Sequence, residues 1–81
     1  MNESEKLRDM LEKAGARPFG TPRDGFAALS FKDLMVFVWD DCGTAFWEIK
    51  DYGSEYAVSG EGQADEAYRD IMVELGEDAP Q

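Results

Sequence analysis

Two segments near the ends of the chain place hydrophobic residues every three or four positions, which is the spacing of one helix face. The first covers Leu7–Ala14, with Asn2 or Ser4 as a capping residue before it and Gly15 as a stop after it. The hydrophobic positions of the second segment are Ala64, Ala67, Tyr68, Ile71, Met72 and Leu75. Because Gly76 then ends this pattern, the sequence predicts one helix near each end of the chain.

Between the two predicted helices, the hydrophobic pattern is that of short β-strands. The strands predicted from this pattern cover residues 26–31, 34–39, 44–51 and 55–59. Residues 15–25 hold three glycines and two prolines, which predict a loop, and residues 40–43 favour a hairpin turn. The hydrophobic run over residues 34–39 is unbroken, which indicates a central strand that is buried on both faces.

Short strands separated by regular turns are typical of an antiparallel meander. The predicted element order is α-β-β-β-α, which is an α+β fold: a three- to four-stranded antiparallel β-meander with an N-terminal and a C-terminal helix. A chain of 81 residues is within the usual size of one domain, so we expect residues 1–81 to form a single compact α+β domain.

The negative charge of the chain is concentrated in its second half. The formal net charge is −10. Residues 1–39 contain six acidic and six basic side chains, whereas residues 40–81 contain twelve acidic and two basic ones. A half-chain of this charge repels phosphate groups, so we expect no direct binding to nucleic acid or to an anionic membrane, and a basic partner instead.

Double-stranded-RNA-binding domains share the predicted element order, and they hold phosphates with lysines at the start of the second helix. The corresponding part of this chain carries Glu61, Asp65 and Glu66. Carboxylates at these positions contradict that function, even where the arrangement of the elements is similar.

The residue types needed for common catalytic sites are missing from the chain. It has no histidine, which excludes Ser–His and Cys–His nucleophile pairs and histidine metal sites. The lone Cys42 follows Asp40 and Asp41, whose charges raise the pKa of a thiol and disfavour the reactive thiolate. Residues 60–62, Gly-Glu-Gly, lack the glycine spacing and the lysine of a phosphate-binding loop. We therefore expect a protein that is not an enzyme, with no catalytic residues, no cofactor and no metal.

The sequence shows no segment that predicts a membrane location. Its longest hydrophobic run, residues 34–39, has six residues, compared with about 20 for a membrane-spanning helix. The first ten residues lack the hydrophobic core of a signal peptide, and a single cysteine suits a reducing compartment. These features predict a cytoplasmic protein.

Acidic residues of the second predicted helix form a ridge along one side. Glu66, Asp70, Glu74 and Asp78 are spaced four apart, and like charges at this spacing cost roughly 0.2–0.5 kcal/mol per pair. From Asp65 to Asp78, six carboxylates span about 20 Å, close to the charge spacing of a nucleic-acid strand. Two interpretations remain open: a solvated helix face, or a surface that meets a positively charged partner.

Further residues are candidates for the same partner-binding surface. Val73 lies in the middle of the acidic face, where it is either an ordinary exposed side chain or an apolar anchor inside a charged rim. Acidic residues on the hairpin side of the chain could extend the negative field. They are Asp40, Asp41, Glu48, Asp51 and Glu55.

A compact acidic chain with a β-meander, helices and no catalytic residues resembles the small phage-encoded anti-CRISPR and DNA-mimic inhibitors. The resemblance lies in size, charge and layout over the whole chain, and it rests on no shared motif. It implies that Asp65, Glu66, Asp70 and Glu74 fill a basic channel that normally holds target DNA. The partner implied is a basic nucleic-acid-binding protein, for example a CRISPR effector complex, which the inhibitor blocks by occupying the channel.

The alternative is a small intracellular interaction or assembly protein that forms a homodimer, or docks on a partner, through the aromatic residues of its meander. Phe46 lies on the same side of its predicted strand as Glu48 and Lys50, so at least part of this aromatic set is expected at the surface. An exposed aromatic patch would indicate a protein contact, with the acidic residues only keeping the protein soluble.

Overall fold

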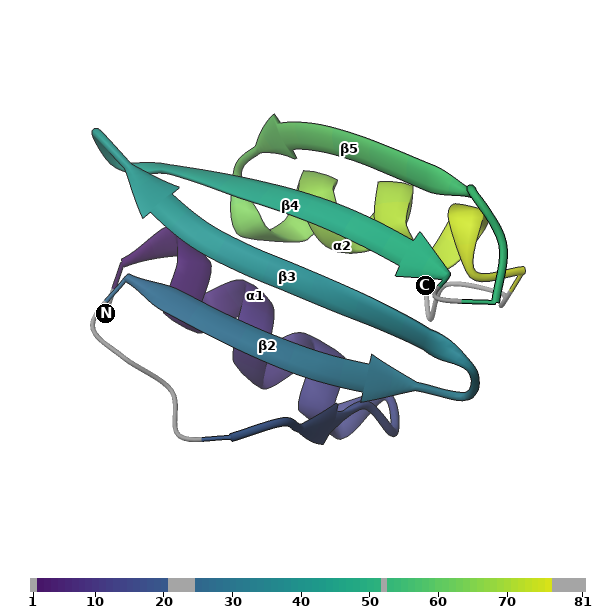
Figure 1. Cartoon of the computed structure of the whole chain (residues 1–81). Coiled ribbons are helices and arrows are strands. Elements are labelled where there is room, and N and C mark those ends of the chain that lie inside the picture. Colours follow the sequence, from purple (N-terminus) through teal and green to yellow (C-terminus); the bar gives the residue numbers. More distant parts are fainter. Residues whose placement is uncertain (1, 21–24, 52, 77–81) are drawn as a thin grey trace.

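The computed structural model describes residues 2–20, 25–51 and 53–76 of the chain. Helices α1 (Glu3–Lys13) and α2 (Ala64–Glu74) precede and follow a five-stranded antiparallel sheet. The strands are β1 (Arg17–Pro18), β2 (Phe26–Phe31), β3 (Leu34–Asp41), β4 (Thr44–Asp51) and β5 (Ala57–Gly62). Figure 1 shows both helices packed on the same face of the sheet. The predicted α+β fold with a helix near each end is confirmed, and the sheet has more strands than the three to four predicted.

The sheet is a meander, because its strand order β1-β2-β3-β4-β5 follows the chain and each neighbouring pair is antiparallel. The β3–β4 hairpin turns on Cys42 and Gly43, whose φ angles are 53° and 82°. Positive φ at both central residues is the geometry favoured in two-residue hairpins. The turn is therefore shorter than the predicted 40–43, and Asp40 and Asp41 are the last residues of β3.

Two stretches outside the predicted strands belong to the sheet. Arg17 and Pro18 form the edge strand β1 and pair with Ser30 and Leu29 of β2. A proline is tolerated at an edge, because no further strand needs its missing N–H. At the other edge, β5 continues through residues 60–62. Glycine is uncommon in strands, so the pattern of residues did not indicate this extension.

Helices α1 and α2 have 11 residues each, and no helix in the described ranges is long and apolar enough to cross a membrane. At the start of α1, the Asn2 side chain accepts a hydrogen bond from the Glu5 N–H at 2.9 Å, so Asn2 is the cap. At the start of α2, Gln63 provides no side-chain cap. Instead, Glu3 Oε1 accepts a hydrogen bond from the Ala64 N–H at 2.9 Å, so a residue of α1 caps α2.

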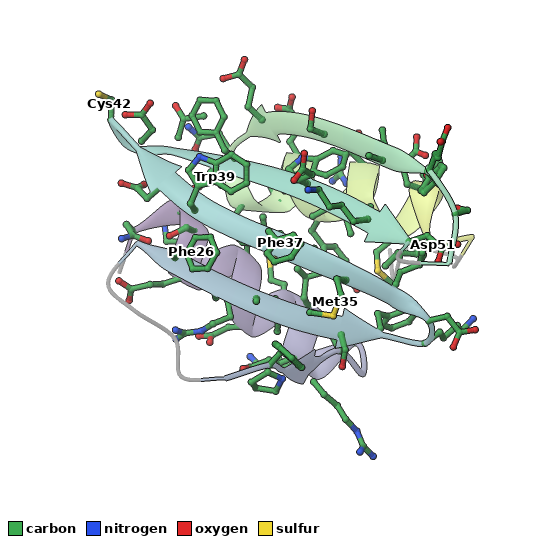
Figure 2. All side chains as sticks on the ribbon, in the orientation of Figure 1. Phe26, Met35, Phe37, Trp39, Cys42 and Asp51 are labelled. Carbon is green, nitrogen blue, oxygen red and sulfur yellow. The ribbon has the colours of Figure 1, made fainter. Side chains whose placement is uncertain are left out.

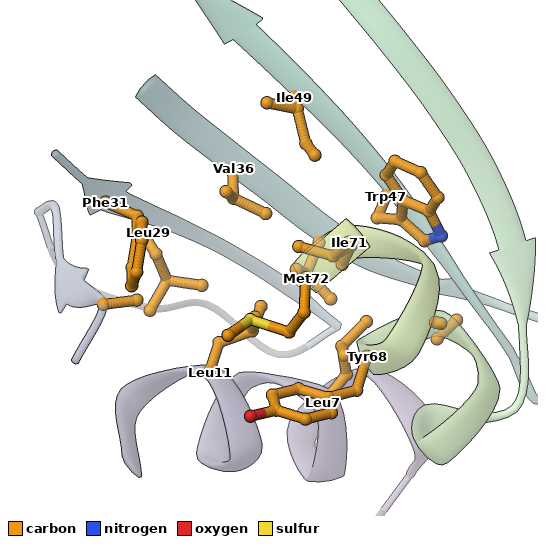
Figure 3. Close-up of a cluster of buried hydrophobic side chains, with 14 of the residues drawn as sticks. Leu7, Leu11, Leu29, Phe31, Val36, Trp47, Ile49, Tyr68, Ile71 and Met72 are labelled. Atoms are coloured by element: carbon orange, nitrogen blue, oxygen red, sulfur yellow. The ribbon is translucent and has the colours of Figure 1, made fainter. Parts of the chain in front are cut away.

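The core lies between the helices and the inward face of the sheet (Figure 3). Helix α1 contributes Leu7 and Leu11 and helix α2 contributes Ile71, each with no exposed surface. Ile49 of β4 is equally buried, and burying an aliphatic side chain of this size contributes roughly 1.5–3 kcal/mol. These residues follow the helical and strand spacings of the sequence, so the predicted inward faces are confirmed.

The central strand β3 is covered on one face. Val36 and Val38 face the helices and have no exposed surface. Met35, Phe37 and Trp39 point the opposite way and are half-buried. The prediction that residues 34–39 are buried on both faces is wrong, because both helices pack on the same side. In the part of the chain that the structure describes, no element covers the opposite side.

Candidate interaction surfaces

Five hydrophobic side chains lie together on the face of the sheet that the helices leave open, and we call them the aromatic face. They are Phe26, Met35, Phe37, Trp39 and Phe46. Figure 2 looks onto this face and shows Phe26, Met35, Phe37 and Trp39 in front of the ribbon. Phe26 is the most open of the five, with 44% of its surface exposed, and the others are half-buried.

The strand register brings the rings of the aromatic face into contact. Trp39 lies opposite Phe26 on one side and opposite Phe46 on the other. The rings of Trp39 and Phe46 stack with their centroids 6.0 Å apart, and the rings of Phe26 and Phe37 lie 6.4 Å apart. Cross-strand aromatic pairs of this kind stabilise a sheet and restrict the rings, so the aromatic face is a preformed surface.

The rim of the aromatic face carries more acidic than basic groups. Glu48 and Glu61 lie on β4 and β5 directly beside the rings, and Asp41 lies at the end of β3. Lys50 is on the same face, and its Nζ lies 3.6 Å from Glu48 Oε1. An exposed ion pair of this length contributes little to stability, so the net effect of these groups is a negative rim.

Two open hollows of about 340 Å³ each flank the edge strand β5. The first, which we call the aromatic hollow, lies on the side of the aromatic face. Its walls include Trp39, Phe46, Trp47, Glu48 and Glu61. The second, which we call the helix hollow, lies on the side of α2. Its walls include Trp47, Val58, Asp70, Val73 and Glu74.

The indole of Trp47 lies beneath β5 and lines both hollows. Gly60 makes room for it, since a Cβ atom on Gly60 would lie 2.5 Å from Cζ2 of the indole. Trp47 is 3% exposed, and its Nε1–H has no hydrogen-bond partner among the described residues. Buried donors are usually paired, so an unpaired N–H is a cost of packing the indole against Gly60.

The acidic residues predicted to form a ridge lie exposed on the outer side of α2. They are Asp65, Glu66, Asp70 and Glu74. Val73 lies among them with 71% of its surface exposed. Asp78, the last member of the predicted ridge, lies outside the described residues. Negative charge in the first turn of α2 also interacts favourably with the helix dipole, so part of the ridge has a structural role.

Glu74 makes a contact that the sequence did not indicate. The Tyr56 hydroxyl donates a hydrogen bond to Glu74 Oε2 at 2.8 Å. This hydrogen bond to a carboxylate raises the pKa of Tyr56 above its usual value. Glu74 therefore joins the end of α2 to the segment just before β5.

The acidic residues predicted on the hairpin side do not gather into one surface with the ridge. Asp41 is exposed beside the turn, whereas Asp40 turns to the helix side, where its Oδ1 is buried and has no described hydrogen-bond partner. Asp51 lies at the far end of the sheet (Figure 2), where its Oδ1 accepts a backbone N–H of the following turn at 2.9 Å. Glu55 is exposed in that turn region, and Glu48 belongs to the rim of the aromatic face.

Cys42 is exposed at the tip of the β3–β4 hairpin. A hydrogen bond with Asp41 and the charge of that carboxylate raise the pKa of the Cys42 thiol, in the predicted direction. The raised pKa disfavours the thiolate, which is the nucleophilic form. Within the described ranges, no group of three or more histidine, cysteine or acidic side chains is placed to hold a metal ion.

Most of the aromatic face was missed in the sequence prediction. Phe26 and Met35 were assigned no role, and most aromatic residues of the meander were expected in the core, because hydrophobic residues of a central strand are usually buried. A signal was present in the alternation: helices on one face that cover Val36 and Val38 cannot also cover Met35 and Phe37.

No protein-family model, curated protein or solved structure matches the chain.

Proposed function

We propose that the protein is a non-catalytic interaction module that binds a partner protein through its aromatic face. One observation carries this proposal: five contiguous hydrophobic side chains lie on a sheet face that nothing in the described residues covers. The opposite face already packs against both helices, so the core does not require these outward side chains to be aromatic. Aromatic residues and methionine are enriched at protein interfaces, where a few large side chains supply most of the binding energy.

The rim of the aromatic face favours a partner with basic groups around an apolar centre. Asp41, Glu48 and Glu61 border the face along β3, β4 and β5, whereas the basic groups on this side are Lys50 and, at the opposite edge of the sheet, Arg17. A second copy would bring two acidic rims together, and each chain carries a net charge of −10, so electrostatic repulsion opposes a homodimer. The proposed partner is therefore a different protein.

The first prediction is that binding depends on the indole of Trp39. Partner proteins would be captured from a cell extract on the immobilised chain and identified, and their affinities would be measured for the wild type and for Trp39→Thr. Threonine keeps the strand propensity but removes the ring, so we expect a loss of about tenfold or more in affinity. Lys13→Gln changes an exposed side chain of α1, away from the aromatic face and from both hollows, and should bind like the wild type.

Circular dichroism and urea unfolding would establish that the Trp39→Thr variant is folded. A folded variant that keeps the full affinity would contradict the proposal. A dimer in sedimentation experiments that Trp39→Thr dissociates would also contradict it, since the aromatic face would then be a contact between two copies of this chain.

A second candidate function, inhibition by DNA mimicry, is favoured by a separate observation. Four acidic residues lie exposed together on α2, where Arg69 is the only basic residue. In this proposal, the partner is a nucleic-acid-binding protein, for example a CRISPR effector complex, and the helix fills its basic channel. The test is the double variant Glu66→Lys with Asp70→Lys, which leaves Glu74 and its hydrogen bond to Tyr56 intact.

The two functions predict different behaviour of the variants. Mimicry predicts that the double reversal abolishes binding, that DNA competes for the partner, and that affinity falls steeply with salt. Docking on the aromatic face predicts that Trp39→Thr weakens binding about tenfold or more and that DNA does not compete for the partner. Full binding by the double reversal would contradict mimicry.

A further inference from the structure

Strand β5 is the last strand of the sheet, and its outer edge pairs with no other strand in the described ranges. Figure 1 shows it at the upper border of the sheet. Its sequence, AVSGEG, has none of the lysines or prolines that commonly block pairing at exposed edges. The edge therefore offers backbone donors and acceptors to another chain.

The register of the sheet identifies the backbone groups that point outward. The Asp51 N–H donates a hydrogen bond to the Tyr56 carbonyl at 3.2 Å, so this pair occupies a hydrogen-bonded position between β4 and the chain leading into β5. Bonded and non-bonded pairs alternate along an antiparallel ladder. Along the register of β4 and β5, the backbone N–H and C=O groups of Ala57, Ser59 and Glu61 therefore point away from β4.

A strand paired with this edge would meet both hollows. Because side chains alternate between the two faces of a strand, successive residues of an added strand would enter the aromatic hollow and the helix hollow in turn. Gly60 lies between the hollows, and the Trp47 indole beneath it lines both of them.

The two hollows combine apolar walls with carboxylates. In the aromatic hollow, Trp39 and Phe46 lie beside Glu48 and Glu61. The walls of the helix hollow combine Val58 and Val73 with Asp70 and Glu74. This combination fits arginine, whose alkyl stem packs on apolar surface while its guanidinium pairs with carboxylates or stacks on an aromatic ring.

We propose that an extended basic segment of the partner adds to the edge of β5 as a sixth strand, with arginine side chains in the two hollows. The inference rests on the proposed function, because the aromatic hollow borders the aromatic face, and it goes further by assigning backbone recognition to β5. A second copy of this chain is a poorer occupant than a basic segment, since β5–β5 pairing would bring Glu61 and the acidic walls of both copies together.

The experiment uses the peptide acetyl-Thr-Val-Arg-Arg-Val-Thr-amide, whose adjacent arginines point to opposite faces of a strand. NMR would follow backbone amide exchange of the full chain without peptide and at saturating peptide. We expect the outward amides of Ser59 and Glu61 to exchange at least about tenfold more slowly in the complex. The amide of Gly20, in the exposed chain after β1, is the internal control and should exchange at an unchanged rate.

Two N-methylated peptides provide matched controls with the same charge. In the first peptide, the methyl groups are on the alternate backbone nitrogens of one edge of the strand. In the second peptide, they are on the alternate backbone nitrogens of the other edge. Because only one edge of an added strand faces β5, one peptide should bind about tenfold more weakly and the other should bind like the parent. Ser59→Pro removes an outward N–H at an edge position where proline is tolerated, and it should weaken binding of the parent peptide similarly.

Each alternative outcome overturns strand addition. Equal affinities of the three peptides, or no binding of the parent peptide, would exclude pairing with β5. Chemical-shift changes at Trp39 and Phe46 without slower exchange at Ser59 would place the peptide on the aromatic face and leave the proposed function intact. Slower exchange that grows with protein concentration and needs no peptide would show self-pairing. Failure of the proposed function itself is a separate result, because it is measured with Trp39→Thr and the captured partner.

Discussion

At the scale of single residues, Gly60 and Trp47 show how one absent side chain shapes a surface. The indole lies under the strand edge because Gly60 has no Cβ, and a Cβ there would lie 2.5 Å from Cζ2 of the ring. The indole itself is 97% buried, so it has little room to move away. The same pair supplies the common wall of the two hollows beside β5.

We therefore expect Gly60→Ala to lower the free energy of unfolding by about 1–3 kcal/mol, the usual cost of overpacking a well-packed site. Urea unfolding followed by Trp fluorescence would measure the change. Ser59→Ala, at the exposed neighbouring position of the same strand, is the control and should change the free energy of unfolding by less than about 0.5 kcal/mol. Equal stabilities of Gly60→Ala and the wild type would show that the indole can move.

Single residues also show the limit of what the sequence could predict for the site. The helical spacing placed Asp65, Glu66 and Asp70 on the outer side of α2 correctly, because that spacing decides which side of a helix a residue occupies. It could not indicate that Phe26 and Phe37 are uncovered. Their exposure depends on where both helices pack, and the unbroken hydrophobic run of residues 34–39 is also typical of a strand that is covered on both faces.

At the scale of elements, the cap of α2 connects the two helices. Glu3 accepts the hydrogen bond from the Ala64 N–H, and its Oε2 lies 2.8 Å from Lys6 Nζ. The hydrogen bond from Ala64, and then the contact with Lys6, lower the pKa of Glu3 below its usual value of 4.5. A carboxyl group with a lowered folded-state pKa stabilises the fold when it is ionised. Its contribution is present above pH 4.5 and is lost as the pH falls through the lower, folded-state pKa.

Glu3→Gln is therefore expected to be less stable than the wild type at neutral pH, and to lose less stability on acidification below pH 4.5. Urea unfolding at a series of pH values would measure both effects. Glu5→Gln removes a carboxylate from the same turn of α1 but leaves the hydrogen bond to Ala64, so it is the matched control and should lose less stability than Glu3→Gln at neutral pH. Parallel curves for Glu3→Gln and the wild type would show that the charge of Glu3 does not support the cap.

The elements differ in how far the sequence could predict them. Both helices carry hydrophobic residues at regular spacing over 11 residues, with a capping residue or a glycine at a boundary, and both were located. Strand β1 has two residues, too few for any period, and it exists because β2 offers it an edge. The end of β5 contains Gly60 and Gly62, so its pairing is decided by β4 and by the space that Trp47 needs. Tertiary contacts outweigh local propensity in both cases.

At the scale of the whole molecule, the negative charge opposes folding. A net charge of −10 on 81 residues repels itself most strongly in the compact state. Each ion pair of the described residues is exposed, is partly exposed, or has a long distance between its charged atoms, so it contributes little to stability. Screening these pairs with salt therefore removes little favourable interaction energy. We therefore expect the midpoint of thermal unfolding to rise when sodium chloride is added from low to physiological ionic strength.

The charge-reversal variant Glu66→Lys with Asp70→Lys provides the control for this prediction. It changes the net charge from −10 to −6, so the rise of its unfolding midpoint with salt should be smaller. Differential scanning calorimetry over a salt series would measure both proteins. A midpoint that falls with salt would show that favourable charge pairs outweigh the repulsion.

The order of the strands in the sheet has a consequence for how the chain folds. Because each strand pairs with its neighbour in sequence, the sheet forms by closing short loops one after another, which favours fast folding. The contact between α1 and α2, with Glu3 capping Ala64, joins parts of the chain that are 61 residues apart. We expect the meander to assemble before this contact forms. During synthesis on the ribosome, α1 can pack on β4 before α2 has emerged, so Trp47 and Ile49 would stay only partly covered until the last turn of α2 completes the core.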